Sequence, residues 1–225
     1  MKKYFLYIWY ISLKDIKVEI QRKELLILTT IFSFTCVVIF NISIDVSIES
    51  YIRVLPGILW VTIFFTAVLG LNRFLSKETD SGNFESLLLL PISRDILFLG
   101  KVTTLFLFMI ILEILIFPIF SIIFNLNLIH TSIIIVAILA TLGISVIGTI
   151  IGSMTSNTGV RETLLPILLF PLIFPMLLAA IEVTGSVLRE ETWSEYNKWV
   201  QLLAIIDIIF IIVCSFLFTH VMKDY

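Results

Sequence analysis

Six long apolar runs occupy most of this 225-residue chain and constrain its fold more than any other feature. A helix needs roughly 17–25 predominantly apolar residues to cross the hydrocarbon core of a bilayer. Runs of that length or longer cover residues 25–44, 54–71, 96–124, 131–153, 163–183 and 200–222. The segments between them are short. The sequence therefore predicts an all-α, polytopic membrane protein with six transmembrane helices in one transmembrane domain, residues 1–225, whose bundle covers residues 25–222.

Composition excludes the other broad classes of protein. Of all residues, 59% are hydrophobic and 14% are charged, whereas a soluble domain carries about 25% charged residues. A soluble globule of this size could not hide so much apolar side chain, and a disordered chain would be poor in apolar residues. A formal net charge of −2 provides no basic field for nucleic acid. Membrane lipid is the expected surrounding, and no nucleic-acid partner is expected.

The positions of Lys and Arg predict the orientation of the helices. Of the 15 basic residues, 12 fall before the first run, after the second, fourth or sixth run, or at the start of the third. Cytoplasmic loops carry an excess of Lys and Arg. Both termini are therefore expected in the cytoplasm.

Residues 1–24 have the pattern of an amphipathic helix. Apolar residues recur at steps of three and four: Leu6, Trp9, Leu13, Ile16 and Ile20. Such a helix lies in the membrane interface with its apolar face toward the lipid. We expect an interfacial helix that leads by an elbow into the first span; the alternative is a frayed leader.

Motifs for enzyme chemistry are absent from the sequence. It contains no G-x-x-x-x-G-K-[ST] phosphate loop, no C-x-x-C-H haem-attachment motif and no H-E-x-x-H zinc motif. We therefore expect no catalytic residues, no metal site and no cofactor held by this chain, and any ATP would bind a separate partner.

Two acids, Glu113 and Asp207, interrupt the third and sixth apolar runs. An acidic side chain at mid-membrane costs about 2.5–3.5 kcal/mol on insertion scales, so each should face protein, pair with another group or be protonated. One interpretation is a polar lining or a proton-handling pair. The other is an interhelical hydrogen bond that fixes packing.

The segment between the second and third runs predicts a short cytoplasmic helix. Charged residues lead into a turn at residues 80–82, and residues 83–90 can form a helix with Glu85 in its first turn. Pro91 ends it. A short, partly apolar helix on this side can dock in a groove of a partner; the alternative is an ordinary amphipathic loop.

Glycine and proline mark the fourth and fifth spans. Gly148 and Gly152 form a G-x-x-x-G pattern, which lets helices approach closely. We favour packing within the chain over a dimer seam. Pro166, Pro171 and Pro175 each remove a backbone donor, so the fifth span is expected to be kinked or broken.

The cytoplasmic segment resembles a pattern of ABC-2-type permeases, E-x-x-x-G-x-x-E-x-L-L-x-L-P. The matching residues are Glu78, Gly82, Glu85, Leu87, Leu88, Leu90 and Pro91. In that family the segment, which here would span residues 80–91 and include Asp80, is the coupling helix that seats in the partner ATPase.

More narrowly, the chain resembles the CcmB family. Residues 55–60 (LPGILW) are similar to its A-P-G-I-I-W entry into the second span, and residues 165–176 are similar to its proline-rich run in the fifth. Residues 69–74 and 88–93 also resemble family runs, although Asn72 stands where the family has an acid before Arg73.

This resemblance implies an ABC-2-type permease fold and a non-catalytic membrane subunit of the ABC complex of cytochrome c maturation. The implied partners are a CcmA-like ATPase, CcmC-like and CcmD-like membrane subunits, a CcmE-like haem chaperone and a second copy of this chain. ATP hydrolysis would drive haem delivery by releasing the haem-loaded chaperone. The implied location is a bacterial inner membrane, or the mitochondrial inner membrane.

Three alternatives remain open from the sequence. The first is a generic ABC-2 exporter of a lipid, drug or polysaccharide. The second is a proton-coupled secondary transporter that uses Glu113 and Asp207. The third is a purely structural membrane scaffold.

Overall fold

The structure, a computed structural model, describes residues 2–43, 48–80, 93–155 and 161–221. These residues form seven helices and no strand, so the all-α prediction is confirmed. In chain order the helices are α1 (Lys2–Arg22), α2 (Glu24–Ser43), α3 (Ile48–Asp80), α5 (Arg94–Ile123), α6 (Thr131–Thr155), α7 (Arg161–Leu188) and α8 (Trp193–Val221).

Six of these helices are long and apolar enough to cross a membrane, as the sequence predicts. The qualifying stretches are Glu24–Ser43, Ile52–Leu71, Arg94–Ile123, Thr131–Met154, Leu164–Leu188 and Trp193–His220. Large apolar side chains on their outer faces remain exposed, among them Ile212 and Phe216 of α8. Such faces are stable in lipid and not in water. The chain is thus a multi-pass membrane protein.

The helices extend past the apolar runs. The second span was predicted at residues 54–71, but α3 runs from Ile48 to Asp80. The fifth and sixth runs were predicted at residues 163–183 and 200–222, but α7 continues to Leu188 and α8 begins at Trp193. Backbone hydrogen bonding carries a helix beyond the hydrocarbon, where charged side chains are solvated. Apolar length therefore underestimates helix length.

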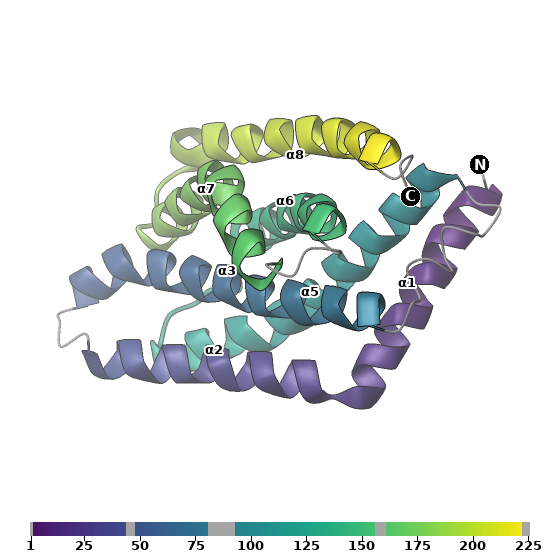
Figure 1. Cartoon of the computed structure of the whole chain (residues 1–225). Helices are drawn as coiled ribbons and strands as arrows, with labels where there is room; N and C mark the ends of the chain where they lie inside the picture. Colours follow the sequence, from purple (N-terminus) through teal and green to yellow (C-terminus); the bar gives the residue numbers. More distant parts are fainter. Residues whose placement is uncertain (1, 44–47, 81–92, 156–160, 222–225) are drawn as a thin grey trace.

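Helix α1 joins α2 through a sharp elbow, as expected for an interfacial helix. Lys23 lies between the two helices with φ of 57°, a left-handed conformation that non-glycine residues adopt infrequently. Figure 1 shows α1 running steeply across the direction of α2, with the start of α1 and the end of α8 at the same end of the molecule.

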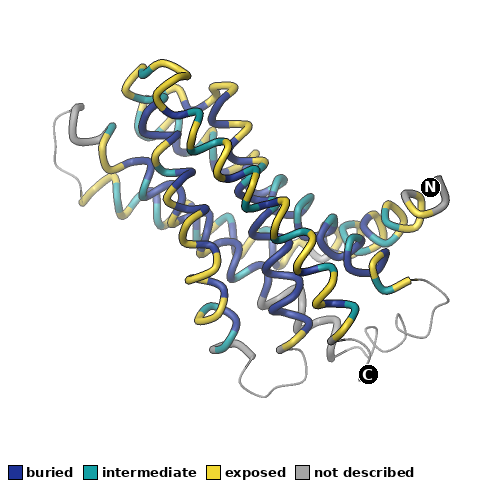
Figure 2. The backbone as a smooth tube through the Cα atoms, turned by 90° about the horizontal axis from the view of Figure 1, so that it is seen from above, coloured by how far each residue is buried: buried dark blue, intermediate teal, exposed yellow. Residues whose placement is uncertain are grey.

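Helix α6 occupies the centre of the bundle, where it contacts α3, α5, α7 and α8. The burial colours of Figure 2 show buried residues on the inner faces of the helices and exposed residues on the outer faces. At Gly148 an added Cβ would lie 2.6 Å from Leu71 Cδ1 of α3. The first glycine of the G-x-x-x-G pattern therefore makes a close contact within the chain, and Gly152, four residues later, is also buried.

Helix α7 continues through Pro166, Pro171 and Pro175 without interruption. The expectation of a broken fifth span is therefore wrong, whereas a kink at these positions stays a prediction. Each proline lacks an N–H donor, but α7 packs against α3, α6 and α8. These contacts hold the helix together where three backbone hydrogen bonds are missing.

Candidate functional site

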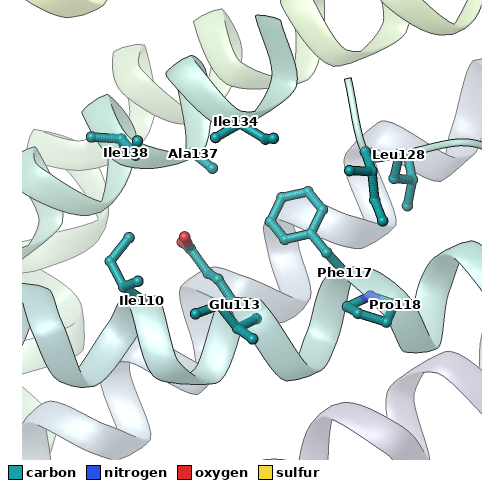
Figure 3. Close-up of a pocket in the computed structure, with 10 residues that line it drawn as sticks. Ile110, Glu113, Phe117, Pro118, Leu128, Ile134, Ala137 and Ile138 are labelled. Atoms are coloured by element: carbon teal, nitrogen blue, oxygen red, sulfur yellow. The ribbon is translucent and has the colours of Figure 1, made fainter. Parts of the chain in front are cut away.

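Glu113 is one of two acids that the structure buries in the membrane-spanning region. It lies on α5 with 4% of its surface exposed, and the Thr141 hydroxyl of α6 donates a hydrogen bond to its Oε1 atom. Figure 3 shows the carboxylate pointing from α5 toward α6. A buried carboxylate is costly unless it is hydrogen-bonded. The Glu113–Thr141 bond therefore links α5 to α6 inside the bundle.

The face of α6 that carries Thr141 continues as a row of hydroxyls. Ser145 Oγ donates to the Thr141 carbonyl and Thr149 Oγ1 donates to the Ser145 carbonyl, each at 2.7 Å. Both residues are buried. Because residues four apart share a helix face, these hydroxyls follow one side of α6. Their donors are used within the helix, so the row contributes small, satisfied polar groups to the packing.

Asp207 has a different environment. It lies on α8 with 2% of its surface exposed, and among the described residues neither carboxylate oxygen has a hydrogen-bond partner. An added Cβ on Gly143 of α6 would lie 2.6 Å from Asp207 Oδ1 and 1.9 Å from the Met176 methyl of α7. The carboxylate therefore sits at the junction of α6, α7 and α8.

The structure does not bring Glu113 and Asp207 together. Glu113 contacts α6 at Thr141, whereas Asp207 contacts α6 at Gly143. Side chains two positions apart on an α-helix point in directions about 160° apart. The two acids thus lie on opposite sides of α6, and this arrangement offers no direct proton exchange between them.

The predicted coupling helix, residues 83–90, lies outside the described residues, as do Gly82, Glu85, Leu87, Leu88 and Pro91. Glu78 and Asp80 belong to the end of α3. Helix α5 begins at Arg94, on the other side of the segment. The segment thus connects the end of one long membrane helix directly to the start of another.

The first part of α5 is hydrogen-bonded to α1 and to α8, the first and last helices of the structure. Ser12 Oγ of α1 donates to the Gly100 carbonyl at 3.0 Å, and Thr219 Oγ1 of α8 donates to Asp95 Oδ1 at 2.7 Å. A Cβ on Gly100 would lie 3.1 Å from the Ile11 side chain, so a small residue lets α1 approach closely. Helix α1, the start of α5 and the end of α8 therefore share one end of the molecule.

An ion pair that the sequence interpretation missed strengthens this junction. Lys101 Nζ of α5 lies 2.9 Å from Asp15 Oδ2 of α1. Ser12, Asp15 and Glu19 recur at three- and four-residue steps on one side of α1, a signal that could have identified its protein-facing side. The predicted apolar stripe is largely uncovered by protein, with Leu6, Trp9, Leu13 and Ile20 all exposed. This face is free to enter the bilayer interface.

Comparisons with known proteins give a consistent result. A family model described as CcmB protein matches residues 6–224. Heme exporter protein B of Haemophilus influenzae is 30% identical over 178 residues, which cover 77% of this chain and 80% of that relative. Proteins of the same name from Escherichia coli (strain K12) and Shigella flexneri are 27% identical over 94 residues. Those two alignments cover 42% of this chain and 43% of each relative, so they span less than half of the relatives' length.

Proposed function

Because the chain belongs to the CcmB family, we propose that it is the permease subunit of a haem-exporter-type ABC complex that serves cytochrome c maturation. The observation that carries the proposal is the extent of the family match, which spans residues 6–224 and so includes all six apolar helices. The subunit is non-catalytic. ATP binds and is hydrolysed on a separate, CcmA-like chain, and haem is handled by the complex.

The proposed mechanism is conformational and uses an ABC-2-type permease fold. Residues 80–91 seat in the ATPase, and closure of the ATPase dimer pushes this segment toward the membrane. The flanking helices α3 and α5 receive the movement because they are joined to it directly. Helix α1 moves with α5, since Lys101 and Gly100 tie the two together. Two copies of the chain act in one complex, and their movement releases the haem-loaded, CcmE-like chaperone from a CcmC-like subunit, with a CcmD-like subunit also present.

The proposed location is the bacterial inner membrane with both termini in the cytoplasm. The charge distribution supports this orientation, because 12 of 15 basic residues fall on the proposed cytoplasmic side. Contacts among α1, the start of α5 and the end of α8 support one shared end for the first helix, the last helix and the α5 flank of the coupling segment.

Substitutions in the coupling segment test the proposal. Gly82→Pro and Glu85→Arg should abolish cytochrome c assembly and uncouple ATP hydrolysis from chaperone release, while membrane insertion stays intact. Gly82→Ala and Glu85→Gln are the matched controls and should remain active. Normal cytochrome c assembly together with normal co-purification of the ATPase in both disruptive variants would refute the coupling role.

One observation favours a second candidate, a proton-coupled transporter. The Asp207 carboxylate is buried and has no hydrogen-bond partner among the described residues, and acids inside membrane helices mark proton relays in pumps and transporters. Activity that survives an ATPase-dead partner but is lost in Asp207→Asn would favour this candidate. Activity lost with the dead ATPase would favour the ABC complex.

A generic ABC-2 exporter shares the proposed fold and coupling mechanism. Purification in mild detergent followed by mass spectrometry of bound subunits separates the two. Co-purified CcmC-like and CcmD-like proteins support cytochrome maturation, whereas an ATPase alone favours the generic exporter.

A further inference from the structure

We propose that a pocket between α5 and α6 binds one acyl chain of a membrane lipid, drawn from the leaflet remote from α1. The pocket has a volume of about 300 Å³, at the lower end of the range of ligand pockets. Its walls come from α5, the connection that follows α5, and the first two turns of α6. Figure 3 shows the labelled side chains around this space, including Ile110, Phe117 and Ala137.

The mouth of the pocket is continuous with the surface that faces lipid. Four isoleucines line the pocket and are also exposed, with Ile114 66% exposed. The other three are Ile129, Ile134 and Ile138. Exposed apolar side chains on a membrane-spanning helix contact lipid chains. A lipid molecule therefore reaches the pocket sideways, without leaving the bilayer.

The position of the pocket along the helices matches one leaflet. It begins near Leu128, in the connection at the far end of α5, and extends to Ile110. Ile110 is 13 residues before the end of α5 at Ile123, or about 20 Å along the helix axis. Half of the hydrocarbon core is about 15 Å thick. An acyl chain whose headgroup lies at the connection thus extends down the pocket to about the middle of the membrane.

The chemistry of the walls selects hydrocarbon over water or a polar headgroup. Glu113 is the one lining residue with a polar side chain, and its carboxylate already accepts a hydrogen bond from Thr141. A buried water requires two to four polar partners, so it has too few here. A charged headgroup would lose its hydration without compensation. An acyl chain gains dispersion contacts with every wall.

The bound acyl chain also covers Glu113, the acidic residue of the pocket. Glu113 lies at the inner part of the pocket, and its bond to Thr141 spans the α5–α6 interface. An acyl chain bound there covers this hydrogen bond from the lipid side and fills the space between α5 and α6. Delipidation should therefore loosen α5 from α6.

Photolabelling tests the proposal in the full-length protein reconstituted into phospholipid vesicles. The probe is a phospholipid with a diazirine in one acyl chain, and labelled peptides are identified by mass spectrometry. We expect labelling of residues 110–118 and 128–138 to exceed labelling of the exposed α8 face around Ile212. Ala137→Phe fills the pocket from α6 and should reduce the α5–α6 labelling roughly tenfold, as about 1.4 kcal/mol of lost affinity would.

Matched variants distinguish a loss of lipid binding in the pocket from a general effect on the fold. Ile212→Phe adds a ring to a lipid-facing position of α8, 65% exposed and away from the pocket, and should leave the α5–α6 labelling unchanged. Ile138→Trp blocks the mouth at an exposed position and replaces Ala137→Phe should that variant not fold. Labelling at α5–α6 that equals labelling at α8, or that persists in the blocked variant, would overturn the proposal.

Discussion

Lys101 Nζ of α5 lies 2.9 Å from Asp15 Oδ2 of α1, and the two side chains are 5% and 13% exposed. This buried ion pair connects the amphipathic first helix to the membrane helix that follows the candidate coupling segment. A helix bound only to the membrane surface would not need an ion pair with the bundle. Helix α1 is therefore packed against the transmembrane bundle as part of the folded protein.

Asp15→Ala should destabilise the folded protein by about 3–5 kcal/mol, because it removes a close counter-charge from a buried ammonium group. The double variant Asp15→Leu/Lys101→Met should cost less, since it removes both charges. Lys17→Ala changes an exposed lysine of the same helix and should cost no more than about 0.5 kcal/mol. The free energy of unfolding in detergent measures all three; equal effects of Asp15→Ala and Lys17→Ala would contradict a stabilising pair.

Gly148→Ala should destabilise the bundle by about 1–3 kcal/mol, because the added Cβ would lie 2.6 Å from the buried Leu71 side chain. Leu71→Val removes the clashing δ-carbons and should recover part of the loss. Gly57→Ala is the control, since its added Cβ would have no heavy atom within 4 Å beyond its chain neighbours and its own helix backbone. That control should be neutral or stabilising in a thermal-unfolding assay, because alanine favours a helix over glycine. A harmless Gly148→Ala would argue against tight α3–α6 packing.

Thr184→Val should cost about 1–3 kcal/mol, because it leaves a buried indole N–H without its acceptor. Trp60 Nε1 of α3 donates to Thr184 Oγ1 of α7 at 2.9 Å, and both residues are fully buried. Thr184→Ser keeps the hydroxyl and should cost less than Thr184→Val. Tryptophan fluorescence during unfolding is the measurement, and indistinguishable Ser and Val variants would exclude a role for the hydrogen bond.

Thr141→Val should destabilise the protein by about 1–3 kcal/mol, because the buried Glu113 carboxylate loses a donor. In a Glu113→Leu background the same substitution should cost little, since no carboxylate then requires a partner. A double-mutant cycle on unfolding free energies measures this coupling. Strict additivity of the two substitutions would show that the Glu113–Thr141 bond contributes nothing to stability.

The ion pair that directly follows α7 predicts a small pH dependence. Arg189 Nε donates to Glu191 Oε1 at 2.6 Å, and this bond, together with Ser186, lowers the pKa of the Glu191 carboxyl. A lowered pKa means that the stabilisation is complete above the unfolded pKa, about 4.3, and is lost as the pH falls through the folded value. The difference in thermal midpoint between the wild type and Glu191→Gln should therefore be constant near neutral pH and vanish in acid. High salt should reduce the difference at neutral pH.

The sequence alone determined the six membrane helices, the amphipathic α1 and the family. Transfer of a helix into hydrocarbon depends on the composition of that one segment, so each span can be recognised without its neighbours. A prediction made segment by segment also leaves two features of the helices undetermined. Charged residues end an apolar run without ending a helix, so α3 extends to Asp80. Proline removes a hydrogen bond without forcing a break when neighbouring helices hold the backbone, so α7 is continuous.

Only the tertiary structure decided which side chains meet. Hydropathy gives the length of a span but not its rotation about its own axis, and that rotation places Glu113 beside Thr141 and Asp207 beside Gly143. The pairing of Asp15 with Lys101 joins residues 86 positions apart, and no local pattern specifies it. Such contacts depend on how several helices pack at once, because each close approach requires complementary shapes on both partners.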